Sequence, residues 1–334
     1  NIFTGDNAQG KTNLVEAMGY LASAKSFRGA QDGQLIRQGA DCARIATEYR
    51  CRSHRGKIEA TLLSDERRSI RIDGMPIRKI SEMMGVLNCV IFAPEDLKTV
   101  KESPSLRRRL MDLEISKIRP SYYLDLQRYA IALKSKNKLL KDFAPDDALL
   151  GAYNATLLEA GSKVIARRQK FVDLLSAHAA ELHSLLTDGK EQLSLQYRAC
   201  CELSDIPTAF AAKLEGAKAR EREMRVSLVG PHREDLMITI GGRDSKLYAS
   251  QGQQRTAMLA IKLACARIAY ESTGEMPVVL LDDVFSELDI SRRERLLSLV
   301  AKHQVFITAT DEAGIGSFKG ARFYRVENGL VFCK

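Results

Sequence analysis

The stretch Gly5-Asp-Asn-Ala-Gln-Gly-Lys-Thr12 decides the fold of this 334-residue chain. Its spacing is G-x-x-x-x-G-K-[ST], in which glycines let the backbone approach phosphate groups and turn its N–H groups toward them. Residues 1–4 before it (NIFT) predict the end of a buried strand, and residues 11–24 after it predict a helix, whose N-terminus attracts anions. The motif therefore predicts a site for a nucleoside triphosphate, which we take to be ATP with Mg²⁺.

Two side chains of this loop have expected roles of their own. Lys11 reaches the β- and γ-phosphates, and the hydroxyl of Thr12 binds the magnesium ion. The backbone and side chains of the rest of the loop surround the phosphates. The residues expected to bind the nucleotide are Gly5, Asp6, Asn7, Ala8, Gln9, Gly10, Lys11, Thr12 and Asn13.

A phosphate loop also needs an acidic partner for the metal at the end of a neighbouring strand. Residues 278–281 are apolar and predict a buried parallel strand, so Asp282 emerges at the carboxyl end, where open α/β sheets place their ligands. We assign Asp282 to the magnesium ion, through a water molecule, and Asp283 to the water that attacks the phosphate. The alternative for this acidic pair is a helix cap that follows a core strand.

The composition favours a polyanionic partner. The net charge is +9, and no apolar run approaches the roughly 20 residues that cross a bilayer. Seven scattered cysteines without a zinc spacing fit the reduced thiols of a cytoplasmic protein. Basic clusters are candidates for sequence-independent contacts with nucleic acid, although each cluster alone is more often a solvated helix face. The clusters are Arg107–Arg109, Arg167–Arg168, Arg292–Arg293 and the series Lys134, Lys136, Lys138 and Lys141.

The pattern along the chain predicts an α/β fold that a helical insertion splits. Residues 43–78 alternate as a β ribbon with a turn at Gly74, and residues 86–92 predict a further strand. From about residue 105 to 222 helical periodicity replaces most strand signals. The apolar series from Leu149 to Leu185 is long enough for an antiparallel helix pair or a short coiled coil, but we prefer a helical subdomain in which this stripe is the core. Later elements are expected at 235–240 (strand), 251–270 (helix), 278–281 (strand), 291–302 (helix), 304–308 (strand) and 323–332 (a hairpin turning at Asn328-Gly329).

A second anion-binding helix start is expected at Ser250-Gln251-Gly252. A serine that caps a helix is common, so this segment is weak evidence alone. Its place in the chain strengthens it: phosphate loop, insertion, Ser-Gln-Gly helix, apolar strand with two aspartates, and then residues 286–289 (SELD). This order resembles the ABC-type ATPase superfamily, in which Ser250-Gln251-Gly252 matches the signature segment and residues 286–289 match the D-loop.

Further segments are similar to the RecF family, a branch of that superfamily related to the SMC proteins. They are residues 5–17 (GDNAQGKTNLVEA), 25–28 (KSFR), 91–97 (IFAPEDL), 103–109 (SPSLRRR), 229–233 (VGPHR) and 281–289 (LDDVFSELD). The resemblance implies an ABC-type ATPase head with mixed sheets, formed by residues 1–115 and 223–334, and a helical lobe of residues 116–222 with short coiled-coil-like helices.

The resemblance also implies a function. The family's members dimerise on ATP, bind duplex and gapped DNA without sequence preference, and act with RecR and RecO to load RecA in DNA repair and replication. Ser250 would then contact the γ-phosphate held by the opposite protomer, so that Asp283, Lys11 and Ser250 form the catalytic set. The chain would be a cytoplasmic, weak, DNA-stimulated ATPase with no membrane partner.

Two departures from the family pattern and one difference from the transporters bear on these expectations. The family has a further N-terminal strand before Asn1, which would pair beside the phosphate-loop strand and help to frame the adenine. The switch position, a histidine in transporters, falls in residues 308–311 (TATD), where Thr310 is the best candidate. Transporter relatives carry Glu where this chain has Asp283, and the shorter side chain predicts slow hydrolysis because positioning dominates phosphoryl transfer.

The sequence leaves three alternatives to a DNA-binding switch ATPase. A transporter ATPase subunit would need a membrane partner, and the signature segment and the missing switch histidine argue against it. A small-molecule kinase with a phosphate loop would need an Arg-rich lid, and it has no use for Ser250-Gln251-Gly252. A nucleotide-gated scaffold without relevant turnover differs from the switch only in whether hydrolysis matters.

Overall fold

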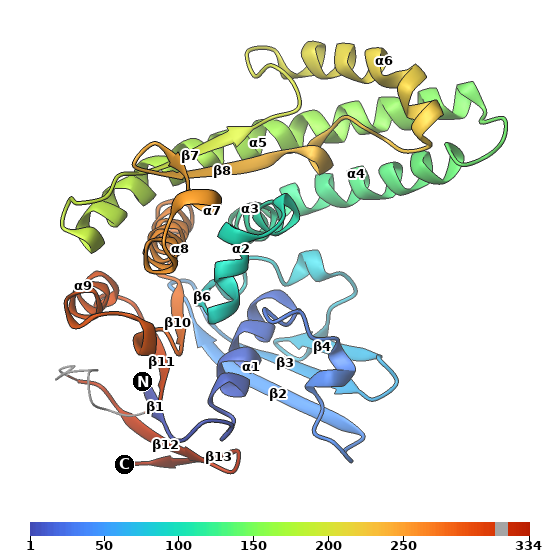
Figure 1. Cartoon of the computed structure of the whole chain (residues 1–334). Helices are drawn as coiled ribbons and strands as arrows, with labels where there is room; N and C mark the ends of the chain where they lie inside the picture. The colour runs from blue at the N-terminus through green and yellow to red at the C-terminus, as the bar shows by residue number, and fades with distance from the viewer. Residues whose placement is uncertain (311–319) are drawn as a thin grey trace. The chain divides into compact units, whose positions relative to one another are not determined.

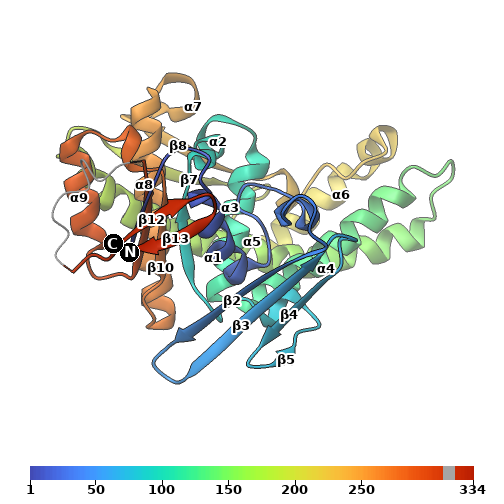
Figure 2. The same cartoon turned by 90° about the horizontal axis from the view of Figure 1, so that it is seen from below.

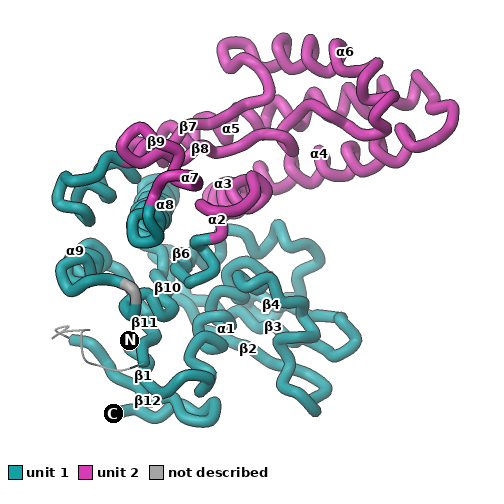
Figure 3. The backbone as a smooth tube through the Cα atoms, in the orientation of Figure 1, with its two compact units in different colours: residues 1–97, 178–192, 250–334 teal, residues 98–177, 193–249 magenta. Residues whose placement is uncertain are grey.

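The structure is a computed structural model that describes residues 1–310 and 320–334, apart from the side chain of Glu287. The chain forms two compact units (Figure 3). Unit 1 comprises residues 1–97, 178–192 and 250–334, and unit 2 comprises residues 98–177 and 193–249. These limits differ from the domain limits expected above, which follow periodicity instead of contacts. The division into an ATPase lobe and a helical lobe stays a prediction.

A six-stranded sheet forms the centre of unit 1, in the order β13-β12-β1-β11-β10-β6 (Figure 1). All neighbouring strands are parallel except β12 and β13, which form the predicted hairpin. β1 therefore has a partner on each edge. The strands are β1 (Ile2–Thr4), β6 (Cys89–Phe92), β10 (Val278–Asp282), β11 (Val305–Ala309), β12 (Phe323–Glu327) and β13 (Leu330–Cys333).

Helix α1 (Lys11–Ser23) is buried on two sides. Val15 and Ala22 pack in one core cluster with side chains of β6 and β10, whereas Tyr20 and Leu21 pack in a second cluster with an antiparallel sheet. Because the helix fills the space between the two sheets, the loop that precedes it is held on a rigid support. The other helices of unit 1 are α8 (Gln251–Thr273) and α9 (Ile290–Val300), and α2 (Leu97–Lys101) begins at its limit.

The antiparallel sheet has the order β2-β3-β4-β5 and confirms the predicted β ribbon and its turn at Gly74 (Figure 2). Ile58, Ala60 and Leu62 alternate on β3 as its buried face. The strands are β2 (Cys42–Arg50), β3 (Arg55–Leu63), β4 (Arg68–Ile72) and β5 (Met75–Pro76). Turns of 3₁₀ helix along the chain are η1 (Asp32–Leu35), η2 (Ile80–Glu82), η3 (Pro94–Asp96), η4 (Pro231–Arg233) and η5 (Phe285–Glu287).

Unit 2 combines helices with a small antiparallel sheet, β7-β8-β9. Arg128 of α4 pairs with Glu159 of α5, and Arg167 of α5 pairs with Asp125, so the two helices run antiparallel. The apolar series from Leu149 to Leu185 forms the single helix α5 and not a helix pair. β7 lies inside the segment predicted to be helical, and that prediction is wrong there. The elements are α3 (Pro104–Ile118), α4 (Pro120–Leu139), α5 (Asp147–Thr187, in this unit through residue 177), β7 (Leu193–Arg198), α6 (Ile206–Met224), β8 (Asp235–Ile240), β9 (Arg243–Asp244) and α7 (Ser245–Tyr248).

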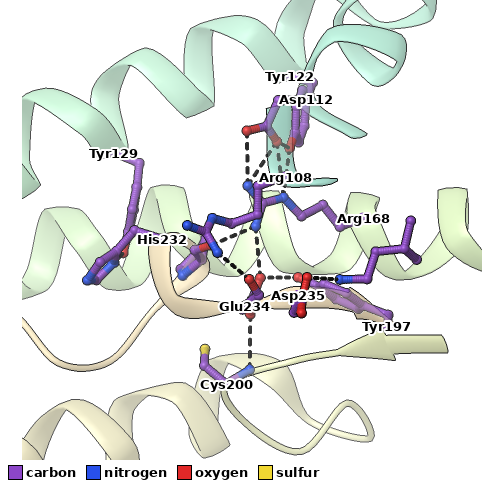
Figure 4. A network of polar contacts seen from close by, with 12 residues as sticks. Arg108, Asp112, Tyr122, Tyr129, Arg168, Tyr197, Cys200, His232, Glu234 and Asp235 are labelled. Atoms are coloured by element: carbon purple, nitrogen blue, oxygen red, sulfur yellow. Dashed lines mark hydrogen bonds and ion pairs between the residues drawn. The ribbon is translucent and has the colours of Figure 1, made fainter. Parts of the chain in front are cut away.

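The core of unit 2 contains buried charges that are paired with one another (Figure 4). Arg168, which is 2% exposed, donates to both carboxylate oxygens of Asp112 and to Oε2 of Glu234 at 3.0 Å. Lys136 of α4 donates to Glu221 of α6 at 2.6 Å, and both side chains are buried. Because a buried charge is tolerated only with a partner, these pairs fix α3, α4, α5 and α6 in one arrangement.

No helix within residues 1–310 and 320–334 has both the length and the apolar character that a membrane crossing requires.

Candidate nucleotide site

The phosphate loop joins β1 to α1, as predicted. Lys11 folds back across the loop, and its Nζ donates to the carbonyl oxygens of Gly5 at 2.5 Å and Asp6 at 2.8 Å. Gly5 lies so close to β12 that an added Cβ would be 2.3 Å from the carbonyl oxygen of Val326. Gly10 immediately precedes α1 with a φ of 100°, a conformation that side chains disfavour. The two glycines therefore permit the close approach and the turn that shape the loop.

Asp282 lies at the carboxyl end of β10, 2% exposed, where the sequence predicts it. Its Oδ1 accepts a hydrogen bond from the Thr12 hydroxyl at 3.0 Å and one from the Thr308 hydroxyl at 2.7 Å. The two expected metal ligands, Thr12 and Asp282, are thus brought together from segments 270 residues apart in the sequence. The two hydrogen bonds to Asp282 join α1, β10 and β11 at the carboxyl ends of the strands.

The electrostatics of Asp282 suit a bound cation. Burial raises the pKa of its carboxyl, the bonds from Thr308 and Thr12 oppose that rise, and the charges of Glu95 and Asp283 add to it. A hydroxyl beside a carboxylate is an oxygen donor set that Mg²⁺ prefers. Among the described residues no group of three or more His, Cys, Asp or Glu side chains is arranged to hold a metal. Magnesium commonly takes one or two protein ligands and completes its shell with water and substrate phosphates, so the residues fit the ion.

Asp283 is held by its backbone. Its N–H donates to Oγ1 of Thr308 at 3.0 Å, and its carbonyl oxygen accepts from the Ser286 hydroxyl at 2.9 Å. Its φ is 50°, a left-handed conformation that is uncommon outside glycine. Strained backbone persists where surrounding contacts fix it, and it concentrates at functional sites. The arrangement fixes where the Asp283 side chain begins, next to the expected metal ligand.

Thr308 was included in the switch segment in the sequence analysis but was assigned no role at the two acids. Its single hydroxyl donates to Asp282 and accepts from Asp283, so it fixes both acids. The parallel register of β10 and β11 places Thr308 beside Asp282, and this register is seen only in the structure. The proposed switch residue, Thr310, lies two positions further along, exposed, and borders the phosphate loop. Asp311 of the same segment lies outside the described residues.

The signature segment begins helix α8 as predicted. The Ser250 hydroxyl accepts from the N–H of Gln253 at 3.2 Å, and the Gln253 side chain accepts from the N–H of Ser250 at 2.9 Å, which is a capping box. Ser250 and Gln251 are exposed, and Gly252 is half-buried. In the D-loop, Asp289 caps α9 through the N–H of Arg292, and the Glu287 side chain is outside the described part of the chain. The role of Ser250 at a partner's nucleotide stays a prediction.

Several residues of the basic clusters have internal roles instead of a role at a surface. Arg107 is 7% exposed, and its guanidinium donates to both oxygens of Asp235, at 2.7 and 2.8 Å. Arg168 and Lys136 belong to the buried pairs of unit 2 described above. Burial removes these three side chains from solvent, so they are neither part of a solvated face nor contacts for a polyanion. Lys134, Lys138 and Lys141 are exposed.

The fold and this site together define a phosphate-loop ATPase head of the ABC type. The model of the family described as RecF/RecN/SMC N terminal domain matches residues 1–328. The chain is 38% identical over 336 residues to the DNA replication and repair protein RecF of Clostridium perfringens, covering 100% of this chain and 93% of that protein. It is 41% identical to RecF of Symbiobacterium thermophilum, covering 93% and 85%. The chain belongs to the RecF family of DNA replication and repair proteins.

Solved structures agree with this assignment. The structure of the recombination mediator protein RecF-ATP in the RecFOR pathway superposes with a TM-score of 0.92 at 33% identity, covering 100% of this chain and 91% of that one. An SMC head domain from Pyrococcus furiosus matches with a TM-score of 0.57 at 16% identity, which shows the shared fold alone. The full-length similarity to RecF disfavours a transporter ATPase subunit and a small-molecule kinase.

Proposed function

We propose that this chain is an ATP-dependent, DNA-binding recombination mediator. The observation that carries the proposal is the hydrogen bond from Thr12 of the phosphate loop to Asp282 of β10, which assembles the metal side of a nucleotide site. The relative that superposes over the full chain is a recombination mediator solved as RecF-ATP. ATP with Mg²⁺ is therefore the ligand that we assign to residues 5–13.

Each residue of the site has a role that its position supports. The N–H groups of the loop and the start of α1 bind the phosphates, and Lys11 leaves the carbonyl oxygens of Gly5 and Asp6 to bind the β- and γ-phosphates. Thr12 and Asp282 hold the metal, which when bound neutralises charge that develops on the phosphates. Asp283 orients the attacking water. Its shorter side chain makes hydrolysis slow, which suits a switch.

ATP acts between two copies of the chain in this proposal. Ser250, Gln251 and Gly252 lie at the start of α8, where helix N–H groups attract an anion. Ser250 and Gln251 are exposed, so a second protomer can reach them. Ser250 of one protomer then contacts the γ-phosphate that its partner holds, and dimerisation depends on ATP.

DNA is the polyanion that the proposal assigns to the net charge of +9. Exposed lysines such as Lys134, Lys138 and Lys141 contact phosphates without reading bases, so binding to duplex and gapped DNA is independent of sequence and falls as salt rises. The protein works in the cytoplasm with RecR, in a pathway with RecO that loads RecA. DNA stimulates its weak ATPase activity.

Sedimentation of the full chain with ATP, with ADP and without nucleotide, in the presence and absence of gapped duplex DNA, tests this function. We expect a dimer with ATP but not with ADP or without nucleotide, and we expect that dimer to bind DNA more strongly than the monomer does. Lys11→Ala abolishes both effects, whereas Lys79→Ala, which removes an exposed lysine outside the site, leaves them intact. A monomer under every condition would overturn the proposal.

A scaffold that only binds ATP is the remaining competitor, and single-turnover hydrolysis distinguishes it from the switch. Asp283→Asn removes the negative charge from the water-orienting residue. A switch then keeps ATP binding and dimerisation but releases DNA more slowly. A scaffold releases DNA at the same rate in both proteins.

A further inference from the structure

The turn that joins α4 to α5 presents an aromatic ring to solvent. The end of α4 and the start of α5 meet at one extremity of unit 2 (Figure 1). Phe143 of this turn is 100% exposed, the highest value for a large apolar side chain in residues 1–310 and 320–334. Aromatic rings dominate the energies of cores and interfaces because their apolar area is large. A ring that contributes nothing to the core is therefore available to a partner.

Hydrogen bonds fix the turn on both sides of the ring. The N–H of Asp142 donates to the carbonyl oxygen of Leu139 at 3.1 Å, which extends the last turn of α4. The Asp146 carboxylate accepts from two N–H groups in the first turn of α5, at 2.8 and 3.2 Å, and so caps that helix. Only residues 143–145 lie between these two anchors. The turn therefore holds Phe143 away from the core.

A row of lysines leads along α4 to this turn. Lys134, Lys138 and Lys141 follow one another at intervals of four and three residues, so they share one face of the helix and its last turn. All three are exposed, and the described residues form no ion pair with them. Lys136, by contrast, is buried with Glu221. Unpaired ammonium groups in such a row can each contact a phosphate of a nucleic-acid strand.

Three aspartates flank the ring, and two of them have partners within the protein. Asp146 caps α5, and Asp147 pairs with Arg222 of α6. Asp142 is exposed on the side of α4, where the three lysines of the row outnumber it. The charge on that side is therefore positive, and the acids of the capped and paired kind lie beyond the ring. A phosphate backbone would follow the lysines, and only a base would reach Phe143.

We propose that Phe143 stacks on an unpaired base at a gap in duplex DNA, while the lysine row binds phosphates of the adjoining duplex. In an intact duplex neighbouring bases cover both faces of every base, so the ring has nothing to stack on. At a gap a base face is free, and stacking on it raises the affinity about tenfold. Stacking tolerates every base, so the contact selects a DNA structure without selecting a sequence. The inference rests on the proposed DNA-binding function and adds the residue that distinguishes gapped from intact duplex.

Phe143→Trp in the full chain tests the contact directly, because the chain contains no tryptophan of its own. The probes are a gapped duplex and an intact duplex of equal length, both closed by hairpins so that no other base face is free, with ATP and Mg²⁺ present throughout. We expect the gapped duplex to quench the fluorescence of Phe143→Trp and the intact duplex to leave it unchanged. Phe143→Ala should lose the roughly tenfold preference for the gapped duplex and keep the affinity for the intact one.

Matched variants separate the effect of the ring from the effect of the charge. Phe332→Trp, at a ring of β13 that is 49% exposed, should keep its fluorescence with either DNA. Lys138→Ala should weaken both DNAs alike and retain the preference for the gapped one. If the gapped duplex does not quench Phe143→Trp, or if Phe143→Ala binds both DNAs as wild type does, the inference is overturned, the DNA-binding function stands, and the ring is left for a protein partner. If wild type with ATP binds neither DNA, the proposed function fails, and the inference fails with it.

Discussion

The buried carboxylates in the core of unit 2 and the buried carboxylate at the nucleotide site of unit 1 have different kinds of partner. In unit 2, Glu221 and Glu234 each face a buried cation, so the charges are neutralised within the protein. In unit 1, Asp282 is equally buried but accepts only from two hydroxyls, and the described residues form no ion pair with it. A buried acid without a cation is costly unless a ligand brings one. The difference separates a charge that serves the fold from one that serves a ligand.

The largest effect is expected where the fold depends on a charge pair. Lys136→Met leaves Glu221 buried and unpaired, and should lower the free energy of unfolding by about 3–5 kcal/mol in denaturant titrations. Arg128, like Lys136, lies on α4, and Arg128→Met breaks its exposed pair with Glu159 of α5. This change should lower the free energy of unfolding by less than about 1 kcal/mol. Equal losses in the two variants would show that the buried pair of unit 2 has no special role.

Thr308 links the two acids of unit 1, so its removal should affect turnover more than binding. Thr308→Val leaves the Asp283 N–H without its acceptor and removes a donor to Asp282, and we expect ATP turnover to fall at least about tenfold with a loss of about 1–2 kcal/mol in stability. Thr310→Val, two residues along and exposed, is the matched control. A larger loss of turnover in that control would return the switch role to Thr310.

Asp282 should make the nucleotide-free protein less stable at neutral pH. Its pKa is raised above the ordinary 3.8, so the folded state holds its proton more tightly than the unfolded chain does. Its contribution to stability is full below pH 3.8 and is lost as the pH rises through the raised value. Asp282→Asn should therefore melt higher than wild type at pH 7 without ligand, and the gap should close in acid.

ATP with Mg²⁺ should raise the melting temperature of wild type but not that of Asp282→Asn. Asp41→Asn, at an exposed acid, should follow wild type in every condition. A lower melting temperature for ligand-free Asp282→Asn at neutral pH would remove the contrast between the two units.

The smallest effect is expected at Asp283. Asp283→Glu adds one methylene and brings the carboxylate nearer the attacking water, so turnover should rise a few-fold in a steady-state ATPase assay. The positive φ at this position strains the backbone of either residue, and this strain limits the gain in turnover. Turnover that stays the same or falls would contradict the idea that side-chain length slows the enzyme.

Sequence alone could predict the parts of the site that local pattern encodes. The phosphate loop is contiguous, and Asp282 follows an apolar strand, so spacing and periodicity locate both. The contact of Thr308 with the two acids could not be predicted, because it depends on which strand lies beside β10. A local sequence pattern does not determine the order of strands in a sheet. The hairpin that braces the loop was predicted as a hairpin, but its contact with Gln9 joins residues 319 positions apart.

The same limit explains the errors in unit 2. Arg107, Lys136 and Arg168 look like surface cations in the sequence, and only the partners Asp235, Glu221 and Glu234 make their burial possible. Those partners are 66 to 128 residues away. β7 was missed because its strand pattern is short and follows a long helical segment. Charge and periodicity thus predict whether a segment is a helix or a strand, whereas the burial of its side chains depends on which other segments pack against it.

The position of β1 between β11 and β12 has a consequence for synthesis. The motif that binds phosphate leaves the ribosome early, yet both strands that flank it come roughly 300 residues later. At about 5–20 residues per second, a bacterial nascent chain carries the motif for on the order of 15–60 s before its neighbours exist. We expect a growing chain to be unable to bind ATP until the hairpin emerges, so nucleotide cannot assist the folding steps that come before it.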